Sequence, residues 1–237
     1  MAGRLRPPCI VEGRRPVAGS APIRPPLSLA PSLPELGAAA RFPYAFFEQP
    51  VVDVARELLG ACLVSYVGGK RCAGVVVETE AYGGPDDPAS HAATRIGVTA
   101  RNRAMFGPAG RAYVYRSYGV HWCMNVVTGR RGQGQAVLLR GLVPIDGEEL
   151  MRERRAGRRP LAAGPGRLAQ ALGITDEVYG HDLSKPPLVL LPGWVVADSD
   201  VVVTGRVGVT AAAHWPHRFY VRGRPGVSRA SRTHIVP

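Results

Sequence analysis

The sequence predicts a single α+β domain built on an antiparallel or mixed sheet. Segments with strand patterns outnumber helical ones, and turns rather than long crossovers join most of them. Hydrophobic residues make up 46% of the 237 residues, which is enough for a core. At about 150 residues per domain, the length fits one large domain with a tail.

Eight segments carry strand features, namely apolar or β-branched runs bounded by turn-forming residues. They are residues 61–66, 72–82, 112–115, 120–127, 136–143, 188–196, 201–207 and 218–221. The first two flank Gly68-Gly69 and the next two flank a tip at 116–119, so each pair predicts a β-hairpin. A long loop rich in Gly, Pro and Asp separates the two hairpins.

Three short helices are predicted from start and stop signals. Asp53 is suited to cap the first helix, which Gly60 ends. Asp146 and Glu149, three residues apart, resemble a capping box that opens the second. The third helix spans about 164–173 and ends at a glycine of its own.

Residues 1–41 differ in composition from the rest of the chain. They are rich in Pro, Ala and Arg, and prolines at this density leave no helical or alternating pattern. We predict a disordered basic tail over 1–41 and a folded domain over 42–237. The tail is either an arm that touches phosphate or an extension without function.

The chain is strongly basic. Lys and Arg number 30 against 18 Asp and Glu, which gives a formal net charge of +12. Only Lys70 and Lys185 are lysines, so arginine supplies nearly all of the cations. This balance favours a polyanionic partner, with nucleic acid ahead of an anionic membrane surface, although GC-rich codon usage also enriches arginine.

Several protein classes do not fit the sequence. No apolar run approaches the roughly 20 residues of a membrane span, and the N-terminus lacks the apolar centre of a secretory signal. The four cysteines form no C-x-x-C pair, which argues against a disulfide framework and a cysteine zinc site. We therefore expect a reduced, cytoplasmic enzyme or binding protein.

The segment 75–82 holds the pattern most suggestive of chemistry. Strand alternation places Val75, Val77, Thr79 and Ala81 on a core face and, on the other face, Val76, Glu78, Glu80 and Tyr82. Two carboxylates and a tyrosine on one face indicate either a cleft, with a general base and a stacking wall, or an exposed edge with ordinary surface glutamates. The pattern alone favours the exposed edge.

Three further polar or aromatic residues are candidates for function. Tyr118 sits at the tip of the second predicted hairpin, where it either projects as a wedge for a base stack or folds back on its own hairpin. Asn125 and Arg140 are isolated polar residues within apolar strands. Since buried polar groups must be paired, each is a structural residue or part of a site.

A series of motifs runs in order from about Phe42 to Ser228. They are Glu78-Thr-Glu80-Ala-Tyr82, His91, and residues 100–106, 113–125, 137–140, 163–168, 206–209 and 218–223. Together they closely resemble the alkyladenine (3-methyladenine) DNA glycosylase family, and the agreement of several motifs in one order is far more specific than any single one.

The resemblance implies a fold and an activity. The expected fold is a single mixed α/β domain around a curved, mostly antiparallel sheet, with a protruding β-hairpin that intercalates into DNA. The expected activity is monofunctional: hydrolysis of the N-glycosidic bond of flipped alkylated purines in double-stranded DNA, leaving an abasic site for base excision repair. Etheno and deaminated purines are further candidate substrates. We expect a monomer without metal or cofactor, associated with the nucleoid of a bacterial-type cytoplasm; the alternative is a non-catalytic nucleic-acid binder of the same fold.

The resemblance also assigns the reaction chemistry to particular residues. Glu80 matches the general base that deprotonates water, and Arg140 matches the residue that holds this water and a nearby phosphate. The backbone carbonyl of Val227 matches a further contact to the water. Bifunctional glycosylases attack with an amine, but Lys70 and Lys185 lie far from these residues in sequence, which favours water as the nucleophile.

Base recognition is assigned in the same way. Tyr82, His91 and Tyr115 match the walls that stack on the flipped base, and Asn125 matches the pocket floor that disfavours the exocyclic amine of guanine. Tyr118 matches the wedge that fills the hole left in the duplex.

Two features are not explained by the resemblance. Val120 and His121 depart from the family pattern after the wedge, which leaves the lesion preference open. The arginines between Arg152 and Arg159 either add phosphate contacts or form a solvated basic face, and we favour phosphate contacts.

Overall fold

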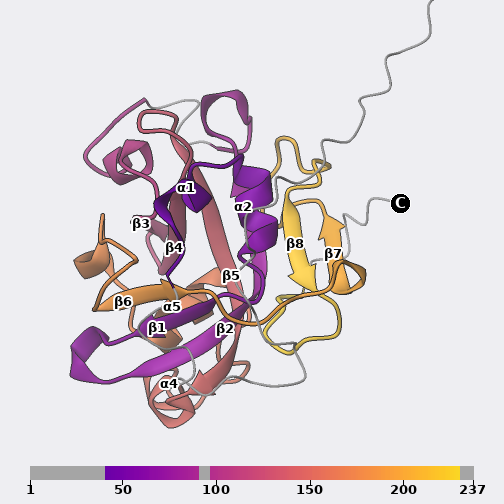
Figure 1. The fold of residues 1–237 in the computed structure, drawn as a ribbon. Coiled ribbons are helices and arrows are strands. Elements are labelled where there is room, and N and C mark those ends of the chain that lie inside the picture. Colours follow the sequence, from indigo (N-terminus) through magenta and orange to yellow (C-terminus); the bar gives the residue numbers. More distant parts are fainter. Residues whose placement is uncertain (1–40, 91–96, 230–237) are drawn as a thin grey trace, which may run out of the picture.

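The computed structural model describes residues 41–90 and 97–229, which form the folded body in Figure 1. The predicted tail, apart from Arg41, and the predicted site residue His91 lie outside these ranges. Across the described ranges, no helix combines the length and the apolar character that a membrane crossing requires.

An eight-stranded sheet forms the centre of the fold, and its named strand pairs are antiparallel. The strands are β1 (Cys62–Ser65), β2 (Cys72–Tyr82), β3 (Ala112–Ser117), β4 (His121–Thr128), β5 (Gln135–Asp146), β6 (Leu188–Leu191), β7 (Val201–Thr204) and β8 (Arg218–Val221). The order along the sheet is β3-β4-β5-β2-β1-β6, and β8, itself paired with β7, joins β2. The predicted α+β domain with a mostly antiparallel sheet is confirmed.

Strand β2 has different neighbours along its two halves. Cys72–Val75 pairs with β1 and Glu78–Glu80 pairs with β8, while β5 follows the other side of β2 along its length. The register between β2 and β5 slips at Val77 and at Arg140, neither of which has a directly opposite residue. Such bulges bend a strand and re-aim its side chains, and in Figure 1 β2 turns upward along its course.

Helices cover the sheet. The described α-helices are α1 (Tyr44–Phe47), α2 (Val51–Glu57), α4 (Glu148–Arg154) and α5 (Pro165–Leu172). Short 3₁₀ helices occupy Val67–Gly69, Gly84–Asp86, Arg103–Phe106, Asp176–Val178 and Asp198–Asp200. Helix α2 packs against β2, β5 and β8, whereas α5 packs against β4, β5 and α4.

Two of the predicted helix starts are wrong. Helix α2 begins at Val51, so Asp53 lies within the first turn, where a carboxylate still favours the helix dipole. Helix α4 begins after Gly147, which has a φ of 66° and no side-chain cap. Asp146 instead ends β5 and forms an ion pair with Arg71 at 2.8 Å. The third helix and its terminal glycine are confirmed.

The main core lies between the helices and the sheet. Its largest fully buried apolar side chains include Leu58, Leu63, Met124, Leu139, Leu142, Met151, Leu168 and Leu172. Thr79 also faces this side, as predicted, because its hydroxyl donates to the carbonyl of Ala55 at 2.7 Å. Val76 joins Val77 in the core, contrary to the predicted alternation, because the bulge at Val77 shifts the strand by one residue.

Two predicted strands end earlier than expected, at Leu191 in β6 and Thr204 in β7. After β6 the chain turns toward α2, and the amide of Trp194 donates to the carbonyl of Gly60 at 2.7 Å. After β7, residues 205–207 leave the strand direction and contact β2 instead of β8. This departure brings them to the candidate site.

Candidate active site

Glu78 and Glu80 are both fully buried, so the interpretation of these residues as an exposed edge is wrong. At this point β2 is an interior strand, with β5 on one side and β8 on the other. Burial of a carboxylate is costly unless cations and hydrogen-bond donors replace water. The two glutamates obtain these partners in different ways.

Arg140 joins the two carboxylates. Its Nε donates to Glu78 Oε1 at 2.9 Å, and its Nη1 donates to Glu80 Oε2 at 3.1 Å. Burial by itself would lower the pKa of Arg140, but Glu80 and Glu78 raise it above its ordinary value. The guanidinium therefore stays charged, and the bulge in β5 turns it toward both glutamates.

Glu78 is saturated with donors. Its Oε1 accepts from Arg140, from Arg218 Nε at 2.8 Å and from the Ser228 hydroxyl at 2.7 Å, while its Oε2 accepts from the Ser228 amide at 2.6 Å. A carboxylate offers about four acceptor positions. Burial would raise the pKa of Glu78, but Arg140, Arg218 and Ser228 together hold it below its ordinary value. Glu78 thus accepts four bonds, three of them on Oε1, and its charge is compensated by two arginines, which makes it the anchor of the pair.

Glu80 has fewer donors. Its Oε2 accepts from Arg140 and from the Tyr82 hydroxyl at 2.9 Å, and its Oε1 accepts from the Val207 amide at 2.7 Å. Burial raises the pKa of Glu80 above its ordinary value, and Arg140, Val207 and Tyr82 oppose this only in part. Among the described residues these donors leave about one acceptor position, on Oε1. The carboxylate is fully buried, so this position does not face bulk solvent.

An aromatic cluster adjoins Glu80. Tyr82, which donates to the carboxylate, packs with Tyr115 against a group of buried residues that includes Tyr113. The rings of Tyr113 and Tyr115 are 5.5 Å apart, so the two side chains lie on one face of β3. The structure thus brings the predicted base and two of the predicted stacking residues together; His91 is outside the described residues.

Asn125 lies in β4, beside this cluster. It is buried, and its side-chain amide donates to the carbonyl of Tyr113 at 3.0 Å. Its Cα faces Tyr113 in β3 and Leu138 in β5, and Leu138 in turn faces Glu80. The bond therefore fixes the orientation of the Asn125 amide.

An open hollow of about 400 Å³ lies beside Tyr115. Its lining residues include Arg101, Arg103, Arg116, Trp122 and Tyr179. Arginines of this kind, interleaved with aromatic rings, suit a nucleic-acid backbone and its bases. Tyr115 and Tyr179 belong both to the lining of this hollow and to the residues around the aromatic cluster.

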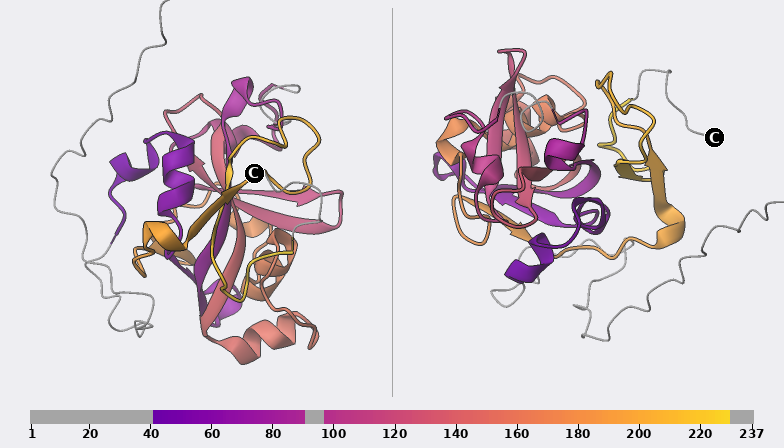
Figure 2. Two further views of the ribbon diagram at one scale, coloured as in Figure 1. Left: turned by 90° about the vertical axis from the view of Figure 1, so that its right-hand side faces the viewer. Right: turned by 90° about the horizontal axis from the view of Figure 1, so that it is seen from above.

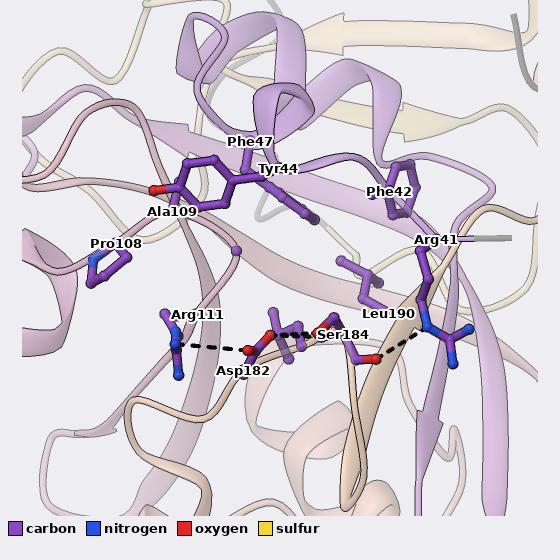
Figure 3. Close-up of a pocket in the computed structure, with 12 residues that line it drawn as sticks. Arg41, Phe42, Tyr44, Phe47, Pro108, Ala109, Arg111, Asp182, Ser184 and Leu190 are labelled. Atoms are coloured by element: carbon purple, nitrogen blue, oxygen red, sulfur yellow. Dashed lines mark hydrogen bonds and ion pairs between the residues drawn. The ribbon is translucent and has the colours of Figure 1, made fainter.

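A second cavity, of about 240 Å³, is not part of this site. It lies between α1 and β6, where Tyr44 and Phe47 face Leu190 (Figure 3). Its carboxylate, Asp182, is 3.7 Å from Arg111 and accepts from the Ser184 hydroxyl at 2.8 Å. Glu80 and the aromatic cluster are absent from its lining.

Tyr118 projects from the tip of the β3–β4 hairpin. Its side chain is 93% exposed, and Val120 beside it is 63% exposed. Tyr118 and Gly119 have φ values of 50° and 69°, and the Val120 amide donates to the Ser117 carbonyl, as in a type I′ turn. The hairpin extends away from the body of the molecule (Figure 2). Of the two alternatives for Tyr118, folding back is therefore wrong.

Val227 lies in a loop that presses against β5. It packs against the main core, and the adjacent Ser228 bonds to Glu78 through its amide and hydroxyl. A side chain at Gly141 would come within 2.0 Å of the Gly226 carbonyl oxygen, so only glycine allows this approach. The loop thus places Val227 next to the anchor carboxylate.

Several arginines of α4 and the following turn have partners within the chain, and the prediction of phosphate contacts stays a prediction. Arg152 and Arg159 form ion pairs with Glu148. Arg154 donates to the carbonyl oxygens of Val67 and Ala171, so its role is structural. These three arginines therefore have ion-pair or hydrogen-bond partners within the chain.

Several site residues escaped the sequence reasoning. Arg218 anchors Glu78, and Asp87 forms a fully buried ion pair with Arg206. Asp87 lies in a loop rich in Gly and Pro, where an aspartate usually stabilises a turn. It does so here as well, because its carboxylate also accepts from the Gly83 amide. The available signal was weak: single arginines next to apolar residues in the segments 206–209 and 218–221.

Comparison with known proteins agrees with this geometry. Residues 45–225 match the methylpurine-DNA glycosylase (MPG) family. A protein named "Putative 3-methyladenine DNA glycosylase" from Methanoculleus marisnigri is 50% identical over 192 residues, which cover 79% of this chain and 98% of that protein. The protein of the same name from Carboxydothermus hydrogenoformans is 43% identical over 190 residues, covering 79% and 98%. The chain therefore belongs to the methylpurine-DNA glycosylase family.

Proposed function

We propose that the chain is a monofunctional 3-methyladenine DNA glycosylase of base excision repair, acting on double-stranded DNA. The observation that carries the proposal is the Glu80 carboxylate, which is buried, ion-paired to Arg140 and left with one acceptor position that the described donors do not fill. Tyr82 and Tyr115 lie beside it, where a base can stack. Family membership and the names of the relatives support the same reaction.

Hydrolysis proceeds in one displacement. Glu80 Oε1 accepts a proton from water while the water oxygen forms a bond to C1′ of the deoxyribose. The bond between C1′ and the purine nitrogen breaks, and its electron pair stays on the purine. A purine made cationic by methylation becomes neutral as it leaves, so it needs no proton from the protein. Arg140 holds the carboxylate charged, and the Val227 carbonyl helps to hold the water.

Recognition combines stacking with extrusion of the nucleotide. Turning a base out of the duplex costs a few kcal/mol, and the exposed Tyr118 fills the gap as the hairpin intercalates. Tyr82, Tyr115 and His91 stack on the extruded base, at about 1–3 kcal/mol per base. A cationic base gains more from electron-rich rings than a neutral one, which favours methylated over etheno or deaminated purines. Asn125 at the floor disfavours the amine of guanine.

The test is product analysis with defined substrates. Duplex DNA methylated with a radiolabelled methyl donor is incubated with the full chain, and free purines are separated from DNA. We expect release of 3-methyladenine and abasic sites without strand cleavage, and no covalent complex on addition of borohydride, because water rather than an amine attacks. Intact substrate would overturn the proposal, and a borohydride-trapped complex would overturn its monofunctional part.

A further inference from the structure

A second buried ion pair lies behind the candidate site. Arg206, which follows β7, is 1% exposed and binds Asp87 through both terminal nitrogens, one of them at 2.7 Å from Asp87 Oδ1. Asp87 is also 1% exposed and accepts from the Gly83 and Ala89 amides. The pair therefore ties the loop after β2 to the turn after β7.

Arg206 contacts two of the donors that serve Glu80. Its guanidinium lies over the Tyr82 ring, 4.9 Å from the ring centre, and it donates to the Ala81 carbonyl at 2.8 Å. The next residue, Val207, supplies the amide that donates to Glu80 Oε1. Besides Arg140, the donors to Glu80 are the Tyr82 hydroxyl and this amide.

The turn that carries Val207 has little freedom. A side chain at Gly205 would come within 2.1 Å of the Ala213 carbonyl oxygen, so the backbone is in close contact on that side. On the other side, the bidentate pairing with Asp87 determines where Arg206 lies. A change at Arg206 is thus transmitted to the Val207 amide and to the Tyr82 ring.

We propose that Arg206, clamped by Asp87, is a positioning residue that holds the Tyr82 hydroxyl and the Val207 amide on Glu80. It touches neither substrate nor water in the proposed reaction, so its effect is on the strength of the base. The inference rests on the proposed function, because it concerns the same carboxylate. A purely structural ion pair would stabilise the fold without affecting the protonation of Glu80.

The other groups near this arrangement bear on its pH dependence. The charged and titratable groups around Glu80 and Arg206 are Glu78, Tyr82, Asp87, Tyr115, Cys123, Arg140 and His217. Burial and Arg206 lower the pKa of His217, and burial raises the pKa of Cys123 to about 11. Loss of donors to Glu80 should move the acid limb of the pH–rate profile, where the rate falls as Glu80 is protonated, to higher pH. The pKa shifts of His217 and Cys123 do not produce this movement.

The test compares Arg206→Lys and Asp87→Asn with the control Arg154→Lys, a structural arginine of α4 that lies outside the site. The maximal single-turnover rate of 3-methyladenine release and the half-saturating protein concentration are measured across pH. Each clamp variant should move the acid limb upward by about one pH unit, which is about tenfold in rate there. The rate at high pH and the half-saturating concentration should stay within about twofold, and the double variant should match the single ones.

Two outcomes overturn the inference while the proposed function stands. In the first, the clamp variants keep the wild-type pH profile. In the second, they lose rate equally at every pH, which is the pattern that a purely structural change such as the control would give. If one clamp variant fails to fold, the other tests the same contact. If the wild type releases no purine, the proposed function fails, and ¹³C NMR titration of the Glu80 carboxyl still decides. The signal is identified by its loss in Glu80→Gln, and an unchanged pKa in Arg206→Lys would reject the positioning role.

Discussion

Glu78 and Glu80 lie two residues apart on β2, share Arg140 and are both fully buried, yet their surroundings differ. Two arginines and both donors of Ser228 surround Glu78, and its pKa is lowered. Glu80 has one arginine, one backbone amide and one phenol hydroxyl, and its pKa is raised.

The difference separates an anchoring carboxylate from a reactive one. Where more donors and cations replace water, the anion is stable and its pKa is lowered. Where replacement is incomplete, the anion binds a proton more tightly and can still accept one from water. The two glutamates flank a single threonine in the sequence, so contacts from β5, β8 and two loops create the contrast.

The largest expected effect comes from removing each charge in turn. Glu80→Gln should lower 3-methyladenine release by at least about 100-fold while methylated DNA still binds, because the base is lost and the pocket is not. Glu78→Gln should instead lower the free energy of unfolding by about 3 kcal/mol, since two buried arginines each lose an ion-pair partner. Single-turnover kinetics and urea unfolding measure the two effects.

The comparison breaks if the phenotypes are exchanged. Full excision by Glu80→Gln would remove Glu80 as the base. A folded Glu78→Gln with the wild-type stability and no excision would make Glu78 the reactive group. Each variant serves as the control for the other, because both replace a fully buried glutamate on one strand with its isosteric amide.

A smaller effect is expected from the arginine that the glutamates share. Arg140 lowers the pKa of Glu80, so Arg140→Lys, which cannot bond both carboxylates in the same geometry, should raise it. Glu80 must be ionised to act as a base. Excision then requires a higher pH, and the acid limb of the pH–rate profile should move upward. An unmoved acid limb would mean that Arg140 does not control the ionisation of Glu80.

The smallest expected effect comes from a change at Tyr118. It tests whether placement of the nucleotide is independent of the strength of Glu80 as a general base. Tyr118→Ala should weaken binding of damaged duplex about tenfold, as expected from one lost stacking contact, with no change in stability or pH profile. Tyr66→Ala, which removes another exposed tyrosine, is the matched control. Equal affinities of the two variants would remove the wedge role, and a shifted acid limb in Tyr118→Ala would contradict the separation.

The sequence reasoning succeeded where local pattern was sufficient. Alternating apolar segments predicted both hairpins, and the predicted tip at 116–119 overlaps the observed one at 118–120 between β3 and β4. It failed at Val76, where a bulge shifts the strand, and at Asp146, which ends β5 rather than capping a helix. In both cases strand pairing with a distant segment overrides the local preference, and no short window of sequence contains that partner.

By itself, the sequence determined the α+β class, the basic character and the motifs that point to the family. The tertiary structure alone decided that the two glutamates are buried and that their hydrogen-bond partners differ. It also decided that Arg218 bonds to Glu78 and that Arg206 packs on the ring of Tyr82. The physical reason is that the free energy of a buried charge depends on the donors around it. Several of those donors, such as Val207 and Ser228, lie more than 100 residues away along the chain, and only folding brings them to β2.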